Sequence, residues 1–117
     1  MRIAVLVLAA ALVAPAASAK DWGLMNCAKA KAADEKAICA DKSLLQKDAV
    51  MSAEFTLLKG FLLMGGRGSL MDEQHDWLAT RAKCGADKAC LNKRYDERID
   101  ALDKWFDVPR ERVVGGG

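Results

Sequence analysis

Hydrophobic and polar positions divide this 117-residue chain into two unlike parts. Residues 3–13 are apolar without a charge, whereas later apolar residues recur at the three- and four-residue steps of a helix face. One face, following Asp41, contains Leu44, Met51, Phe55, Leu58 and Leu62. Another, following Asp87, contains Leu91, Tyr95, Ile99, Leu102 and Phe106. No segment alternates convincingly as a strand would, so the pattern predicts an all-α fold.

Acidic residues indicate where the helices begin. Asp34, Asp41 and Asp87 can each accept hydrogen bonds from the free amides of a first helical turn. They predict a short helix from Asp34 to Cys39 and the two longer helices that carry the apolar faces. With a further helix over about residues 70–84, the chain is expected to form a small bundle of about four helices.

Two features interrupt this regular pattern. The glycine-rich run 65–68 is interpreted as a connection between helices, because glycine weakens a helix and a phosphate-binding loop would need a preceding strand and a lysine at its end. Asp48 falls on an apolar face and is interpreted as the point where that face leaves the core. Pro109 and the terminal glycines are expected to end the last helix.

The first 19 residues resemble a secretion signal. Arg2 precedes the apolar run, and the small residues 17–19 suit signal peptidase, which predicts cleavage after Ala19. The apolar run is too short to cross a membrane core of roughly 30 Å, so it is not interpreted as a membrane anchor. No second long apolar run follows it, so no membrane span is expected after cleavage. We therefore predict a signal peptide at 1–19, a helical domain at 20–108 and a flexible tail at 109–117. A lipoprotein acylated at Cys27 is the weaker alternative, because Lys20 and Asp21 separate that cysteine from the apolar run.

Export determines how the four cysteines are interpreted, because an even number of cysteines in an oxidising compartment usually forms disulfides. Four cysteines allow three alternative sets of two disulfides. Pairing of Cys27 with Cys39 and of Cys84 with Cys90 closes the shortest loops, and is therefore predicted. A zinc site of four cysteines is the alternative, but neither pair has the gap of two to four residues usual for zinc, and no Cys-x-x-Cys redox motif is present.

Charge and residue content argue against several functions. The formal net charge of +2 falls to +1 without Arg2, so no strong field favours nucleic acid or an anionic membrane. The one histidine, His75, lies in a polar stretch and is interpreted as an exposed helix residue. No nucleophile–base set or pair of acids points to a hydrolase. We therefore expect no catalysis, no metal and no cofactor.

Two cysteine motifs resemble the LprI-type lysozyme-inhibitor-like domain family. The similar positions are Cys27-Ala28-Lys29-Ala30 with Glu35-Lys36-Ala37-Ile38-Cys39, then Gln74, Trp77-Leu78, Arg81 and Cys84, then Cys90-Leu91, Tyr95 and Arg98. The resemblance covers about residues 27–102 and implies a small extracytoplasmic helical domain. The family is named after members that bind and inhibit lysozyme. The chain departs from the family pattern at Lys47, at Phe55 and in the glycine-rich run.

The motif residues are interpreted as structural. Gln74, Trp77 and Arg81 share one helix face, so Trp77 can be buried while Arg81 stacks on it or pairs with an acid such as Glu35. Gln74 can satisfy a backbone group. The alternative is a recognition patch, since tryptophan and arginine are common at interfaces.

The run from Phe61 to Gly68 is the predicted contact surface, through Phe61, Leu62, Met64 and Arg67. The sequence thus predicts a periplasmic or secreted binding protein, with lysozyme or another envelope protein as its partner. The alternative is a structural or envelope-stress accessory that binds no lysozyme. Animal-type lysozymes are strongly basic, so the near-neutral charge of this chain offers no electrostatic steering toward them.

Overall fold

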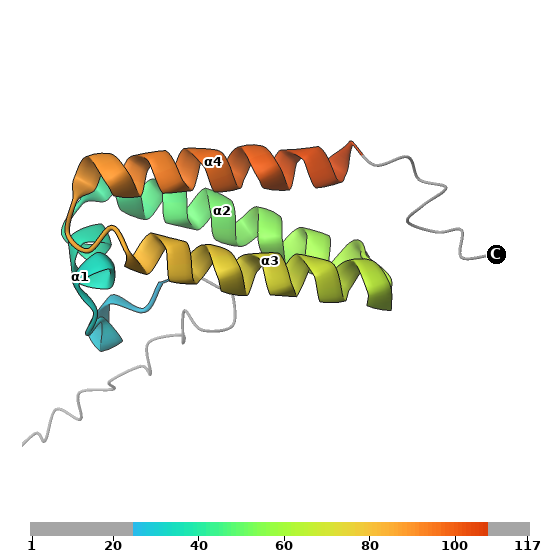
Figure 1. Cartoon of the computed structure of the whole chain (residues 1–117), viewed down its shortest axis with the longest axis horizontal. Coiled ribbons are helices and arrows are strands. Elements are labelled where there is room, and N and C mark those ends of the chain that lie inside the picture. The colour runs from blue at the N-terminus through green and yellow to red at the C-terminus, as the bar shows by residue number, and fades with distance from the viewer. Residues whose placement is uncertain (1–24, 108–117) are drawn as a thin grey trace, which may run out of the picture.

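A computed structural model describes residues 25–107 and contains a bundle of helices without a strand in that range. A 3-10 helix, η2 (Cys27–Lys29), precedes α1 (Ala33–Cys39), α2 (Lys42–Phe61), α3 (Met64–Ala82) and α4 (Lys88–Phe106). The three long helices lie side by side, and α1 packs at the end where α2 and α4 begin (Figure 1). The predicted signal peptide, its cleavage site and the tail 109–117 fall outside the described residues.

Two of the three predicted N-caps are confirmed. The Asp41 carboxylate accepts from Leu44 N at 3.0 Å, and the Asp87 carboxylate accepts from Cys90 N at 3.1 Å. The prediction for Asp34 was wrong: α1 is preceded by Ala32 at its N-cap, and Asp34 lies inside the first turn. Its carboxylate is held by a distant arginine instead, so a long-range contact competes successfully with the local one.

The glycine-rich run was wrongly predicted to connect helices. Gly65, Gly66 and Gly68 all lie in α3, and the connection consists of Leu62 and Leu63 in extended conformation. Glycine costs up to about 1 kcal/mol in a helix relative to alanine, a preference that tertiary context commonly outweighs. A Cβ added to Gly66 would make an ordinary van der Waals contact with the Leu62 side chain at 3.4 Å, and Gly65 and Gly68 have nothing within 4 Å, so the packing does not require glycine here. Leu62, just before α3, is buried at the turn.

The predicted apolar faces supply most of the core. Its buried members are Ile38, Leu44, Met51, Leu58, Leu62, Leu70, Trp77, Leu91, Tyr95 and Leu102. Phe55 and Ile99 are partly buried against this core, whereas Phe106 is exposed near the end of α4. The interpretation of Asp48 was wrong, because its side chain is buried in the middle of the α2 face.

Both predicted disulfides are confirmed. Cys27–Cys39 ties η2 to the end of α1 with a Cα–Cα distance of 5.6 Å, and Cys84–Cys90 spans the corner between α3 and α4 with 5.5 Å. Gly85 adopts a φ of +55° in that corner, a conformation that glycine reaches without steric cost. Two disulfides are typical of a protein in a non-reducing, extracytoplasmic environment. Among the described helices, none is long and apolar enough to span a membrane.

Candidate functional site

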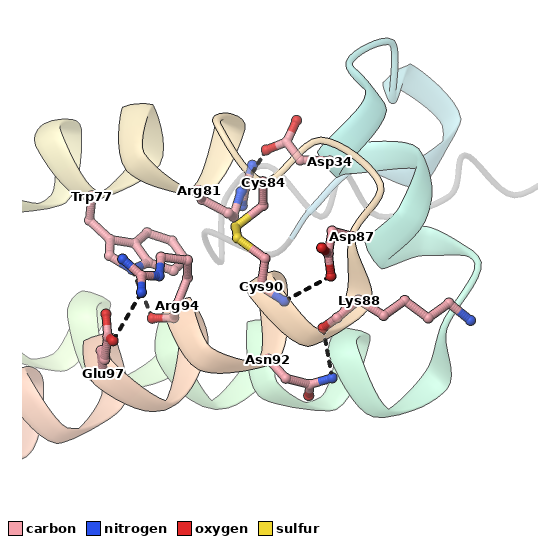
Figure 2. The surroundings of a disulfide bond; sticks show 10 residues. All are labelled: Asp34, Trp77, Arg81, Cys84, Asp87, Lys88, Cys90, Asn92, Arg94 and Glu97. Atoms are coloured by element: carbon pink, nitrogen blue, oxygen red, sulfur yellow. Dashed lines mark hydrogen bonds and ion pairs between the residues drawn. A yellow bond between two sulfur atoms is a disulfide. The ribbon is translucent and has the colours of Figure 1, made fainter.

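Arg81 of α3 lies at the centre of a buried polar network. Its Nε donates to Asp34 Oδ2 of α1 at 2.9 Å, and its Nη1 donates to the Tyr95 hydroxyl of α4 at 3.3 Å. Nη1 also lies 3.9 Å from Asp48 Oδ1 of α2. Figure 2 shows Arg81 reaching Asp34 beside the Cys84–Cys90 bridge. One side chain thus connects all four α-helices.

Asp48 completes this network. Its Oδ1 accepts from the Tyr95 hydroxyl at 2.8 Å, and its Oδ2 accepts from Met25 N at 3.0 Å. The carboxylates of Asp34 and Asp48 and the guanidinium of Arg81 are therefore removed from water together, and Asp48 accepts two further hydrogen bonds. Buried charges are tolerated when they are paired and hydrogen-bonded in this way, so we assign the network a structural role.

Trp77 is buried beside the network, as the sequence predicts. Its indole Nε1 donates to the carbonyl of Arg94 at 3.0 Å, and its ring meets Tyr95 edge-on with centroids 5.2 Å apart. The Arg81 guanidinium carbon lies 5.6 Å from the centre of the Trp77 ring, so the predicted stacking of these two residues is confirmed. The predicted acid partner was wrong, because Asp34 rather than Glu35 pairs with Arg81. Glu35, one position along the helix, accepts only a 3.3 Å bond from Lys31 N.

A second polar cluster joins α3 to α4. Arg98 Nε donates to Gln74 Oε1 at 2.9 Å, and Arg98 Nη1 lies 3.4 Å from Glu73 Oε2. Burial lowers the pKa of Arg98, and the Glu73 carboxylate opposes that shift. Gln74 therefore contacts a side chain, not the backbone group that the sequence analysis proposed. Of the remaining motif residues, Lys29 is exposed on η2.

Sequence reasoning missed three acidic residues. Asp34 and Asp48 are partners of Arg81, and Asp48 had a usable signal: a charged residue within an apolar stripe commonly has a buried partner. Glu54 of α2 is the third, since burial and then the nearby Asp103 carboxylate raise its pKa. This acid pair lies between α2 and α4, and no third metal-ligating side chain joins it. Within residues 25–107, no group of three or more His, Cys, Asp or Glu side chains is arranged to hold a metal ion.

The four predicted contact residues divide into an exposed set and a buried one. Phe61 and Met64 are 67% and 89% exposed, and Arg67 is also exposed, whereas Leu62 is only 7% exposed and belongs to the core. Leu63, not predicted as a contact, is 55% exposed. We call Phe61, Leu63 and Met64 the apolar tip. It lies at the α2–α3 turn, at the opposite end of the bundle from α1 (Figure 1).

No family model, curated protein or solved structure matches this chain.

The network predicts an unusual alkaline titration. Burial, and then the Asp48 carboxylate, hold the pKa of Tyr95 well above its ordinary value of about 10. Because the folded state binds this proton more tightly than the unfolded state, the stabilisation is complete below about pH 10 and is lost as the pH rises further. Tyr95 is the only tyrosine of the chain, so tyrosinate absorbance reports it alone. We expect that absorbance to appear together with loss of helical circular dichroism.

The same titration in concentrated urea provides the control, where Tyr95 should ionise near its ordinary pKa of about 10. Reversible ionisation at that pH in a chain that remains fully helical would contradict the burial of the hydroxyl between Asp48 and Arg81.

Proposed function

We propose that this chain is an exported, non-catalytic binding protein that acts through protein–protein contact at its apolar tip, with lysozyme as the first candidate partner. The observation that carries the proposal is the exposure of Phe61, Leu63 and Met64 at the α2–α3 turn. Large apolar side chains gathered at one exposed place often mark an interaction site. Aromatic residues and methionine are also enriched in protein interfaces.

The position of the tip supports this proposal. Phe61 ends α2, Met64 begins α3, and buried Leu62 anchors the turn between them. The two helices thus present the exposed side chains from a supported turn, which lowers the entropy lost on binding. Leu57 is also exposed and lies one helical turn before Phe61, so it extends the apolar surface along α2.

Three features support a non-catalytic role. All four cysteines of the chain are in disulfides, so none is available as a thiolate nucleophile. His75 is exposed on α3, as the sequence predicts, and Arg81 is engaged by buried carboxylates.

The resemblance of the cysteine motifs to the LprI-type domains supplies lysozyme as the partner to test first. The signal-like segment, together with the disulfides, supports a periplasmic or secreted location.

The test is a titration of lysozyme with the purified oxidised protein, read as lysis of a cell-wall suspension. We expect lysozyme activity to fall with added protein, and the variant Phe61→Ser/Met64→Ser to require at least about tenfold more protein, because the loss of central apolar contacts weakens an interface by this order or more. An apolar contact also predicts little change in potency between about 0.05 and 0.5 M salt.

Met71→Ser is the matched control, since Met71 is an exposed methionine elsewhere on α3. Protein that has been reduced, alkylated and freed of reductant tests the need for the bridged fold without exposing lysozyme to reductant. If excess folded protein leaves lysozyme fully active, the inhibitor proposal fails and the accessory role replaces it. Equal potency of the tip variant and the parent protein would exclude the tip as the contact surface.

A further inference from the structure

A cavity of about 410 Å³ opens between the N-terminal segment, α1, α2 and α3. Its lining includes Met51, Ser52 and Phe55 of α2 and Gln74, Leu78 and Arg81 of α3, and no residue of α4 or of the apolar tip. Small-molecule sites commonly measure about 300–1,000 Å³, and a cavity of about 150 Å³ already accepts a benzene ring. The space is therefore sufficient for one aromatic ring and the atoms attached to it.

Ser52 supplies an unsatisfied polar group at this cavity. The residue is 2% exposed, and its Oγ has no hydrogen-bond partner among residues 25–107. A buried hydroxyl without a partner is costly, and most are satisfied in native proteins. Rotation about χ1 between staggered positions can present this hydroxyl to a bound group. A ligand with one hydroxyl would supply the missing hydrogen bond.

Gln74 offers a second polar group that is only weakly engaged. Its Nε2 donates to the Met51 sulfur at 3.2 Å, while its Oε1 is held by Arg98. A thioether is a weak acceptor, so the amide can exchange this contact for a ligand oxygen at little cost. The contact with Arg98 keeps the amide oriented during that exchange.

The remaining walls determine the charge and shape of the occupant. Met51, Phe55 and Leu78 are apolar, and methionine sulfur makes favourable contacts with aromatic rings. The Arg81 guanidinium serves both Asp34 and Asp48, so these three groups keep one negative charge and an anionic occupant would be repelled. Both Asp48 oxygens already accept hydrogen bonds, from Tyr95 and Met25, so a neutral occupant costs the least desolvation. The occupant is therefore a neutral aromatic ring with a hydroxyl.

The rim suits a peptide more than an isolated ring. Lys29 and Glu35 both line the cavity, one as a donor and the other as an acceptor. Lys29 is exposed, and Glu35 holds only one long hydrogen bond, from Lys31 N. One donor and one acceptor at an opening match the carbonyl and the N–H of a peptide group.

We propose that this cavity binds a tyrosine side chain presented on a peptide, with the phenol at Ser52 and Gln74 and the backbone at Lys29 and Glu35. The site is separate from the apolar tip, and the proposal does not require that lysozyme be the partner. Phe61→Ser/Met64→Ser should therefore leave binding at the cavity unchanged, so the two proposals can fail independently.

N-acetyl-tyrosinamide is the probe, titrated into the full oxidised protein and followed by amide chemical shifts. We expect saturable shifts at Met51, Ser52 and Gln74 with a dissociation constant of about 0.1–1 mM, which is the range that small-ligand efficiency allows. N-acetyl-phenylalaninamide, which lacks the hydroxyl, should bind about fivefold more weakly, the value of one neutral hydrogen bond.

Ser52→Ala should remove most of this difference, because the remaining contact of the phenol with Gln74 only replaces the hydrogen bond of that amide to the Met51 sulfur. The variant should not unfold, because it removes an unpaired hydroxyl and places alanine in a helix. Ser69→Ala, at an exposed position of α3, is the control and should preserve the fivefold preference. An undiminished fivefold preference in Ser52→Ala would overturn the assignment of the hydroxyl contact to Ser52.

The rim has its own test. Lys29→Ser should weaken binding of the tyrosine probe by about threefold. It should leave the binding of p-cresol, a phenol without a peptide group, unchanged. Lys31→Ser is the matched control at an exposed neighbouring lysine. If p-cresol binds as tightly as the tyrosine probe, the peptide assignment is overturned. No shift at the lining residues with about 10 mM probe would overturn the site altogether.

Discussion

Replacement of Arg81 by alanine is expected to lower the free energy of unfolding by about 3–5 kcal/mol, because it leaves two buried carboxylates without their counter-charge. Asp34 loses its 2.9 Å partner, and Asp48 keeps only the Tyr95 hydroxyl and Met25 N. Urea unfolding of the oxidised protein at neutral pH measures the change. Arg67→Ala is the matched control on the same helix, where an exposed arginine should contribute within about 0.5 kcal/mol.

The triple variant Asp34→Ala/Asp48→Ala/Arg81→Ala separates charge from packing. Residues in one network are strongly coupled, so the triple variant should lose much less stability than the sum of the three single changes. A loss below about 1 kcal/mol for Arg81→Ala alone would show that the carboxylates are adequately solvated without it. Arg81 would then be available for recognition, contrary to the structural role assigned here.

Trp77→Ala should lower the free energy of unfolding by a similar amount, roughly 3–5 kcal/mol, because it removes a large buried ring. The ring packs edge-on against Tyr95 and lies under Arg81, while its Nε1 satisfies the carbonyl of Arg94. The cavity left in the core should therefore also loosen the polar network. Far-UV circular dichroism in a urea titration is the appropriate measurement, since the substitution itself changes tryptophan fluorescence.

Trp77→Phe divides this effect into two parts. It keeps most of the aromatic packing but loses the indole N–H, and should cost about 1–2 kcal/mol. Leu78→Ala, at the adjacent exposed position, should have a small effect on stability. If Trp77→Ala costs less than about 1 kcal/mol yet abolishes partner binding, Trp77 is a recognition residue and its assignment to the core is wrong.

The arrangement of these parts has a functional consequence. Both disulfides and the Arg81 network lie toward the end of the bundle that contains α1, whereas the apolar tip lies at the far end of α2 and α3 (Figure 1). The stabilising elements therefore leave the proposed contact surface unobstructed. Substitutions at the tip should alter binding with little effect on stability, which makes it a suitable place to test the proposed function.

Local interactions were predicted well from the sequence. Asp41 and Asp87 cap their helices through amides only three residues away, and the apolar stripes of α2 and α4 follow the helical period. The paired cysteines are separated by only 12 and 6 positions in the sequence, so their pairing could also be predicted from local sequence. The all-α fold class follows from these signals, because each of them depends on residues within a few turns of one another.

Tertiary structure alone decided the polar contacts and the α2–α3 turn. Asp34 and Arg81 are 47 positions apart, as are Asp48 and Tyr95, so no local pattern could indicate their pairing. The choice of Asp34 over Glu35 depends on which side of α1 faces α3, which packing determines. The glycine-rich run forms the start of α3, and the turn lies at Leu62 and Leu63 instead, with Leu62 buried. The sequence by itself determined the helices and bridges through short-range preferences, whereas the buried network and the cavity required the packing of distant segments, where desolvation leaves few partners for each buried charge.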